Sequence, residues 1–146
     1  MIKNLDDLLN IKKQIQPIIK ARLGMAELAE GQQQILVCSG TGCNSSGSYS
    51  LQGELKRQIK ARGLQEKVQV IQTGCFGFCK LGPIAVVCPE GIFYCHVKKE
   101  DTAELIESLI SGKEVTRLLF HDPVSNLPNR HMKDIHFFQA QERLAL

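Results

Sequence analysis

The stretch Thr73-Gly-Cys75-Phe-Gly-Phe-Cys79-Lys-Leu-Gly82-Pro83 places two cysteines in a glycine-rich loop, and the rest of the chain is arranged around it. A second pair of cysteines lies upstream, in the stretch Cys38-Ser-Gly-Thr-Gly-Cys43. Each pair follows a short apolar run that is typical of a buried strand, residues 35–37 before the first pair and residues 68–71 before the second. We therefore expect the four thiols to converge on one inorganic centre.

The composition of the chain argues against several classes of protein. The 146 residues are 43% hydrophobic and carry a formal net charge of +3, which suits one domain of ordinary size with tails. The basic side chains form no patch, so we expect no nucleic-acid partner. No run of about 20 apolar residues predicts a membrane span, and no apolar segment near the N-terminus indicates a signal peptide. We therefore expect a cytoplasmic protein, in which close cysteine pairs indicate metal or redox chemistry rather than structural disulfides.

The apolar pattern predicts an α/β fold with a β-α-β-β-β-α core. The two strands before the cysteine pairs are joined by a helix that begins just after Cys43, with Ser46 or Ser48 as its cap. The apolar stripe of this helix is expected to be buried: Leu51, Leu55 and Ile59. Residues 84–97 predict a hairpin, and residues 100–111 predict a last helix. Together these elements predict a sheet with helices packed against it, which is a small α/β sandwich.

Residues 1–34 predict an amphipathic helix followed by a polar linker. Apolar residues recur at helical spacing between residues 4 and 23: Leu8, Ile11, Ile15, Ile18, Ile19 and Leu23. Asn4 is expected to cap this helix, Pro17 to kink it or break it in two, and Gly24 to end it. The sequence leaves two interpretations open, a helix packed on its own domain and a docking arm for a partner subunit.

Residues 119–146 predict an irregular C-terminal tail. Asp122-Pro123, Asn126 and Leu127-Pro128 are signals for loop structure. The aromatic segment from Ile135 to Leu144 predicts the beginning of a further element without its completion.

Four thiolates are the ligand set of a 2Fe-2S cluster, with two on each iron, and Cys38, Cys43, Cys75 and Cys79 supply that number. The glycines around them allow a close approach of the backbone, whose N–H groups stabilise negatively charged sulfur. Zinc is the first alternative, although zinc pairs commonly have two intervening residues where these pairs have four and three. A dithiol oxidoreductase is the second alternative, and the Cys-x-x-Cys motif that it favours is absent from the sequence.

Other candidate residues are given structural interpretations. Phe76 and Phe78 are expected to alternate with the ligands and exclude water. Cys88 and Cys95 lie on the strands of the hairpin, do not face each other, and are expected to be small buried hydrophobes rather than ligands. The four histidines have no second ligand at useful spacing and are expected to be ordinary surface or core residues: His96, His121, His131 and His136.

The spacing Cys38-x4-Cys43 followed by Cys75-x3-Cys79 resembles that of the thioredoxin-like 2Fe-2S ferredoxins. The segments Ser45-Ser-Gly-Ser-Tyr49, Gly82-Pro83 and Pro89-Glu-Gly-Ile-Phe-Tyr94 are also similar to that family. The resemblance covers residues 35–118. It implies a thioredoxin-like sandwich that binds a 2Fe-2S cluster through the four cysteines.

Within that family, the chain is most similar to the N-terminal domain of the NADH-oxidising flavoprotein (β) subunit of NAD-dependent and electron-bifurcating iron-only hydrogenases, which is related to the NADH-binding subunit of complex I. Residues 5–23 and 137–146 resemble the segments that flank the domain there. The resemblance implies one-electron transfer between a flavin/NADH domain and other iron–sulfur proteins. Plant-type 2Fe-2S centres have potentials of about −400 mV, and we expect a low potential of that general kind. It implies no catalytic residue in this chain itself, although the whole assembly would be an oxidoreductase.

Three alternatives about the chain's state remain open at this point. The chain could be a free-standing 2Fe-2S ferredoxin rather than a piece of a larger subunit. It could be a structural four-cysteine zinc module. A homodimer is also compatible with exposed edge strands and with the N-terminal helix.

Overall fold

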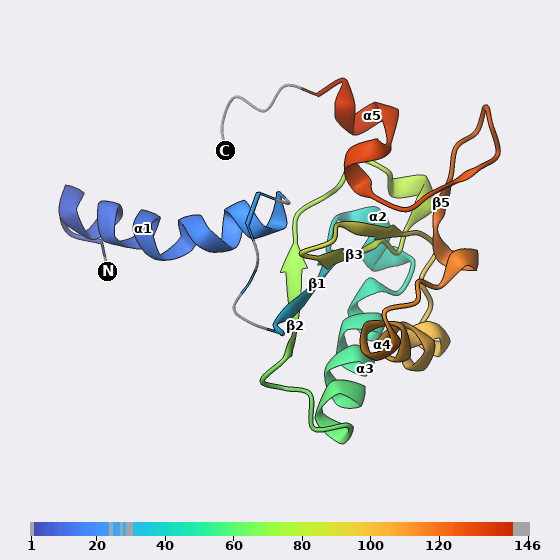
Figure 1. The fold of residues 1–146 in the computed structure, drawn as a ribbon, viewed down its shortest axis with the longest axis horizontal. Helices are drawn as coiled ribbons and strands as arrows, with labels where there is room; N and C mark the ends of the chain where they lie inside the picture. The colour runs from blue at the N-terminus through green and yellow to red at the C-terminus, as the bar shows by residue number, and fades with distance from the viewer. Residues whose placement is uncertain (1, 24, 27, 29–30, 142–146) are drawn as a thin grey trace.

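A computed structural model describes residues 2–23, 25–26, 28 and 31–141 of the chain (Figure 1). Its helices and strands follow in the order α1 (Leu5–Arg22), β1 (Gln33–Cys38), α2 (Thr41–Ser45), α3 (Ser48–Ala61), β2 (Val68–Thr73), β3 (Ala85–Cys88), β4 (Ile92–Tyr94), α4 (Thr102–Ser111), β5 (Phe120–His121), β6 (Pro128–Asn129) and α5 (His136–Gln139). Short 3-10 turns lie between them: η1 (Cys79–Leu81), η2 (Lys99–Asp101), η3 (Thr116–Leu118) and η4 (Met132–Asp134). The predicted β-α-β-β-β-α core is confirmed, with α2 and the elements after α4 as additions to it.

The four main strands form one sheet in the order β2-β1-β3-β4. β1 runs parallel to β2 and antiparallel to β3, and β3 and β4 form the predicted hairpin. α3 makes the crossover between β1 and β2, as a parallel pair requires. Cys38 at the end of β1 lies opposite Thr73 at the end of β2. The two cysteine-bearing segments therefore leave the sheet side by side at the same end.

One face of the sheet packs against α3 and α4. The stripe that the sequence predicts in α3 is buried against this face, and Leu105 and Ile106 of α4 are buried with it. Because side chains alternate along a strand, every second strand residue points to this face. These residues are aliphatic with one exception: Ile35, Val37, Ala85, Val87, Ile92 and Tyr94. We call this side the helix face.

The opposite side of the sheet, which we call the aromatic face, is covered by the segment after β2 and by the C-terminal tail. Its central side chain is Phe93, which is fully buried. Four rings contact Phe93 at centroid distances between 5.7 and 6.5 Å: Phe76 and Phe78 from the cysteine loop, and Phe120 and Phe138 from the tail. The second face of the sheet is thus closed by loops that carry aromatic rings.

The C-terminal tail is more regular than the sequence predicts. β5 and β6 pair with each other, and the segments around them bond to the hairpin β3–β4. The backbone N–H of Cys95 donates to the carbonyl of Leu118 at 2.7 Å, and the N–H of Phe93 donates to the carbonyl of Arg130 at 3.0 Å. The tail therefore satisfies backbone groups of β4 that an edge strand would otherwise leave free.

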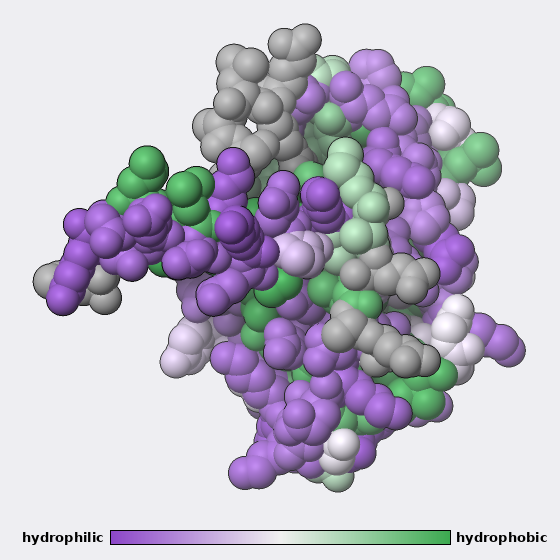
Figure 2. All heavy atoms as spheres, turned by 60° about the vertical axis from the view of Figure 1, so that its left-hand side comes forward, coloured by the Kyte–Doolittle hydropathy of each residue, from purple (hydrophilic) through white to green (hydrophobic). Residues whose placement is uncertain are grey.

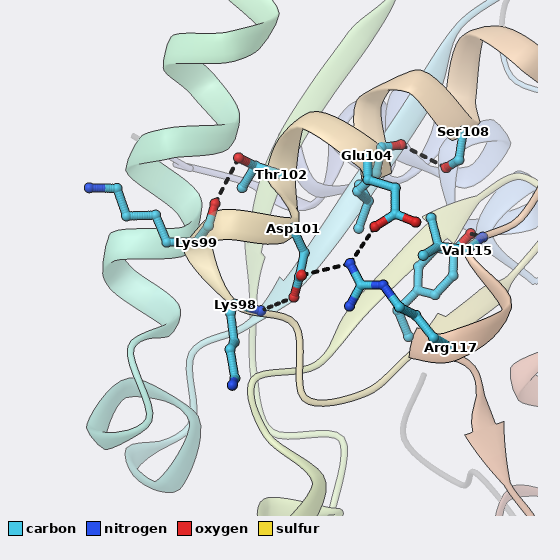
Figure 3. A network of polar contacts seen from close by, with 10 residues as sticks. Lys98, Lys99, Asp101, Thr102, Glu104, Ser108, Val115 and Arg117 are labelled. Carbon is cyan, nitrogen blue, oxygen red and sulfur yellow. Dashed lines mark hydrogen bonds and ion pairs between the residues drawn. The ribbon is translucent and has the colours of Figure 1, made fainter.

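Arg117 ties the beginning of the tail to α4 (Figure 3). Its guanidinium Nη2 donates to Asp101 Oδ1 at 2.7 Å and also donates to the carboxylate of Glu104. Asp101 Oδ2 accepts the backbone N–H of Lys98 at 2.8 Å. This network fixes η3 beside the start of α4, which is the point from which the tail turns back toward the sheet.

α1 forms as the sequence predicts, with one difference. Asn4 is its cap, because the Oδ1 atom of Asn4 accepts the backbone N–H of Asp7 at 2.9 Å. The helix continues without interruption through Pro17, so the predicted break into two helices is not found. It ends at Arg22 with Leu23 as its C-cap. The predicted stop at Gly24 lies outside the described residues.

α1 projects from the body of the molecule instead of packing along it (Figure 1). Only Ala21 of the helix is buried, and Arg22 joins the helix to β1 through a 2.8 Å hydrogen bond from its Nε atom to Gln34 Oε1. The apolar residues from Leu5 to Ile19 keep 36% to 69% of their surface exposed. Figure 2 shows apolar groups gathered on one side of the projecting arm. The structure thus rules out the interpretation of α1 as a helix that covers its own domain.

Within the residues that the structure describes, no helix is both long enough and apolar enough to cross a membrane.

Candidate metal centre

The first cysteine pair lies at the end of β1 and in the short helix that follows it. Cys38 is the last residue of β1, and Cys43 is the middle residue of α2. The sequence predicts a helix that begins just after Cys43, and α3 is that helix. The short helix α2, which begins before Cys43, is not predicted. The predicted caps are also wrong: Gly47 occupies the N-cap position of α3, and Ser46 instead donates its hydroxyl to the carbonyl of Gly42 at 3.0 Å.

Two polar residues of α3 hold the first loop from the side of the helix face. The hydroxyl of Ser48 donates to the carbonyl of Cys38, and Gln52 Nε2 donates to Ser39 Oγ at 2.9 Å. Both side chains belong to buried residues. Neither role is predicted from the sequence, in which Gln52 is not singled out and Ser48 is expected only as a possible cap. The available signal was a polar residue one helical turn before Leu51 and another next to it, both beside a predicted buried stripe.

The second cysteine pair lies in the loop after β2, where both thiols are exposed. The Sγ atoms of Cys75 and Cys79 are 3.6 Å apart, and the backbone N–H of Gly77 donates to Cys75 Sγ at 3.3 Å. Gly77 has φ +89°, a conformation that favours glycine. Two thiolates on one tetrahedral metal with bonds of about 2.3 Å would lie roughly 3.8 Å apart. The spacing of Cys75 and Cys79 suits two ligands of one metal atom.

Glycines allow the two cysteine segments to touch. A Cβ atom placed on Gly40 would lie 3.1 Å from Cys75 Cβ, and one on Gly42 would lie 3.1 Å from Cys79 Cβ. Each of these glycines belongs to the first loop, and each partner belongs to the second. Glycine at these two positions thus allows the two cysteine segments to pack against each other.

A third glycine closes the site from the other direction. A Cβ atom on Gly82 would lie only 2.7 Å from Cys43 Sγ. Since Gly82 precedes β3 and Cys43 lies in α2, this contact joins the first loop to the end of the second. A larger residue at this position would displace the thiol.

The four thiols lie close enough to change one another's pKa. Burial raises the pKa of Cys43 to about 12, and a hydrogen bond with Cys38 adds to this effect. The backbone N–H of Gly77 lowers the pKa of Cys75, whereas the hydrogen bond with Cys75 raises the pKa of Cys79. Cys38 contributes to the pKa shift of each of the other three thiols. The structure therefore brings all four predicted residues together.

The four thiols form two adjoining pairs, Cys38 with Cys43 and Cys75 with Cys79. Among the described residues, no three cysteine, histidine, aspartate or glutamate side chains are placed around one point as a single metal ion requires. A four-cysteine zinc site needs all four sulfurs at one ion, whereas a 2Fe-2S cluster takes two on each of two irons. The donor set and its division into two pairs match what a 2Fe-2S cluster takes, which is two sulfurs on each iron.

The aromatic residues of the second loop alternate with its cysteines, as expected, and pack against the sheet. Phe76 and Phe78 turn inward to Phe93, each at a centroid distance of 6.2 Å. They exclude water from the protein side of the loop, while Cys75 and Cys79 beside them stay exposed. The reason is that the loop lies across the aromatic face, which partly buries both of its rings.

Cys88 and Cys95 lie apart from the four thiols. Cys88 is opposite Gln34 at the beginning of β1, four residues before Cys38, which is roughly 13 Å along a strand. Cys95 follows β4, two strands away from β1. Burial raises the pKa of Cys88 to about 11 and that of Cys95 to about 12, so both thiols stay protonated. Their placement agrees with the prediction of buried hydrophobes.

Comparisons with known proteins identify the family of the chain. The sequence model of the thioredoxin-like 2Fe-2S ferredoxin family matches residues 24–110, which include all four cysteines of the two loops. The chain is 40% identical over 77 residues to a 2Fe-2S ferredoxin of Clostridium pasteurianum, a match that covers 53% of this chain and 76% of that one. It is 43% identical over 51 residues to a 2Fe-2S ferredoxin of Aquifex aeolicus, with 34% of this chain and 46% of that one covered.

A solved structure supports the fold. The crystal structure of the wild-type thioredoxin-like 2Fe-2S ferredoxin from Aquifex aeolicus superimposes with a TM-score of 0.57 at 29% sequence identity. The superposition covers 62% of this chain and 98% of the ferredoxin. With its fold, its family match and its 2Fe-2S relatives in agreement, this chain belongs to the thioredoxin-like 2Fe-2S ferredoxins, proteins of one-electron transfer whose cofactor is a 2Fe-2S cluster.

Proposed function

We propose that Cys38, Cys43, Cys75 and Cys79 are the four ligands of the 2Fe-2S cluster. The observation that carries this proposal is the contact between the two loops at Gly40, Gly42 and Gly82, which leaves the four thiols as mutual neighbours. When bound, the cluster supplies a site that takes up and releases one electron.

The protein residues would contribute unequally to this site. Cys38 and Cys43 are buried, so their side of the cluster would be shielded from water. Cys75 and Cys79 are exposed, so their side would be the route by which an electron reaches a partner. The Gly77 N–H would stabilise negative charge on the sulfur of Cys75. Cluster binding would release protons, because the ligands must be thiolates.

Serine substitutions of individual cysteines test the ligand set. Anaerobic reconstitution of the wild-type protein should give about two irons and two sulfides per chain, and dithionite should produce the EPR signal of a reduced 2Fe-2S cluster. Cys38→Ser, Cys43→Ser, Cys75→Ser and Cys79→Ser should each lower the bound iron or change the spectrum. The matched controls Cys88→Ser and Cys95→Ser should leave iron content and spectrum unchanged. A control that lost iron while Cys79→Ser kept it would overturn the assignment.

We further infer that this chain works as the ferredoxin-like part of an NADH-oxidising flavoprotein subunit, as in NAD-dependent hydrogenases. Two observations support this. The family match ends at residue 110, and the segments outside it resemble the flanks of that domain in such subunits. α1 also presents an apolar side that nothing within the described residues covers, as a docking arm would. In this proposal residues 1–34 are the arm and linker, residues 35–118 the ferredoxin domain, and residues 119–146 the connection to the flavin/NADH domain.

A free-standing ferredoxin is the second candidate, because the two relatives above are themselves named 2Fe-2S ferredoxins. Electron delivery from an NADH-reduced flavoprotein of the complex I type separates the two candidates. The assembly proposal expects bleaching of the cluster spectrum at a rate that depends on α1. The double variant Ile11→Glu/Ile15→Glu should slow it, while Lys13→Glu, a charge change on the same helix, should have a smaller effect. Equal rates in all three proteins would favour the free-standing ferredoxin.

A further inference from the structure

α5 lies directly on the loop that carries Cys75 and Cys79. The ring of Phe137 is 4.6 Å from the ring of Phe78, measured between centroids, and the two planes are inclined at 62°. A Cβ atom on Gly77 would lie 3.3 Å from two carbon atoms of the same Phe137 ring. Gly77 and Phe78 both lie between the two exposed cysteines of the loop, and Phe78 directly precedes Cys79. Phe137 therefore contacts the loop between its two cysteines, at Gly77 and Phe78.

The position of α5 is fixed by the sheet and does not depend on the loop alone. Ile135, immediately before the helix, is 2% exposed and belongs to the aromatic face. The backbone N–H of Met132 donates to the carbonyl of Gly91 at 2.9 Å, which anchors η4 to the hairpin turn. Phe138 then contacts both Phe93 and Phe78, at centroid distances of 5.7 and 5.4 Å. Because these contacts hold α5 against the sheet, α5 can support the loop.

The loop needs such a support because of its conformation. Gly77 has a positive φ, and its N–H is aimed at Cys75 Sγ. Glycine has the greatest backbone freedom of any residue, so a turn built on it is held only by what surrounds it. On the outer side the loop faces solvent. The ring of Phe137, which is itself 41% exposed, lies beside this turn, with two carbon atoms 3.3 Å from the position that a Cβ on Gly77 would take.

We propose that Phe137 is a positioning residue for the cluster loop, and that its ring holds the Gly77 turn in the conformation that directs the amide to Cys75. This role rests on the proposed ligand set. It belongs to a residue beyond the segment matched by the family model, which ends at residue 110. Residues that orient metal ligands from outside the ligand sphere typically change metal affinity by about 10- to 100-fold when they are mutated.

Hydrogen exchange in the metal-free protein tests the role without relying on the cluster. Phe137→Ala should speed amide exchange at residues 74–80, while the α3 residues around Leu55 keep their protection. Phe137→Tyr, which keeps the ring, should restore the wild-type rates. Val124→Ala is the matched control, since Val124 lies in the same tail and is 94% exposed. Unchanged exchange at residues 74–80 would overturn the proposal, as would faster exchange throughout the chain.

The loaded protein provides the second measurement. Phe137→Ala should lose its iron to a chelator about 10-fold faster than the wild type, with an altered visible circular dichroism spectrum, and Phe137→Tyr should restore both. Wild-type rates and spectrum in Phe137→Ala would overturn the positioning role while leaving the ligand assignment intact. A wild-type protein that bound no iron would instead contradict the proposed function, and the exchange data would still decide whether Phe137 holds the loop.

Discussion

The two faces of the sheet are built from the same strands and differ in nearly every other respect. The helix face is aliphatic apart from Tyr94 and is covered by α3 and α4, whose apolar side chains pack against each other and against the sheet. At the beginning of α3, Ser48 and Gln52 also bond to the first cysteine loop. The aromatic face is covered by a loop and a tail, and it includes Cys38 and Cys43. The first face requires only burial, whereas the second must also present sulfur atoms at defined positions. The comparison indicates that folding stability and cluster binding can be changed separately.

The largest expected effect is on the aromatic face. Phe93→Ala should lower the free energy of unfolding by about 3–5 kcal/mol, because it removes a fully buried ring. The variant should also lose its cluster faster, since Phe76 and Phe78 of the cysteine loop rest on this ring. Urea denaturation and iron release to a chelator measure the two quantities. Cluster retention equal to that of the wild type would mean that the aromatic face does not support the loop.

Leu55→Ala makes the matching change on the helix face. The free energy of unfolding should fall by about 2–5 kcal/mol, because the side chain is fully buried between α3 and the sheet. At temperatures where the variant is still folded, the iron-release rate should stay at the wild-type value. If Leu55→Ala destabilised the cluster as much as Phe93→Ala, the distinction between the faces would be lost.

Gly82→Ala tests the contact between the two loops. The backbone of Gly82 has φ −70°, which alanine adopts freely, so the effect should come from crowding. The tightest approach is 2.7 Å to Cys43 Sγ, and the carbonyl oxygen of Cys79 lies at 3.3 Å. Crowding of this kind typically costs about 1–3 kcal/mol of stability, and here it should also reduce iron binding. Gly53→Ala is the control, because Gly53 lies inside α3 with no atom within 4 Å of its Cβ position. That change should stabilise the protein by up to about 1 kcal/mol, since alanine favours helix.

The smallest effect concerns the solvent side of α3. Hydrogen bonds from Arg57 and then Gln58 lower the pKa of Glu54 from 4.5 to about 2. A carboxylate whose pKa is lower in the folded state stabilises the protein above its unfolded pKa, and that contribution is lost as the pH falls from 4.5 toward 2. The unfolding midpoint of the wild type should therefore fall slightly more over this range than that of Glu54→Gln. Parallel curves for the two proteins would show that this exposed pair contributes nothing.

Much of the helix face could be predicted from the sequence, and little of the aromatic face. The stripe of α3 and the alternation of the strands are local patterns, so apolar spacing was enough to find the β-α-β-β-β-α core. The packing of Phe137 on Gly77 joins residues sixty positions apart, and no local pattern encodes it. The four cysteines could be predicted as ligands because their number, their spacing and the glycines beside them are local features of the sequence.

Local propensity misplaced the details around Cys43. Serine is a frequent helix cap, so Ser46 and Ser48 were the natural choices for the start of α3. In the structure Ser46 bonds back to Gly42 at the end of α2, and Ser48 bonds to the carbonyl of Cys38. Tertiary contacts with the cysteine loop thus replaced the local capping bonds, and the sequence contains no sign of that competition.

The unequal exposure of the two cysteine pairs also sets the direction from which the site is damaged. Thiol oxidation depends on exposure and thiolate character, and Cys75 is exposed with a lowered pKa. Oxidants would therefore attack the outer pair first, while Cys38 and Cys43 stayed reduced behind it. The exposed side of the site, at Cys75 and Cys79, would be accessible both to an electron-transfer partner and to oxygen. A partner bound there would therefore protect the thiols from oxidation as well as exchange electrons with the site.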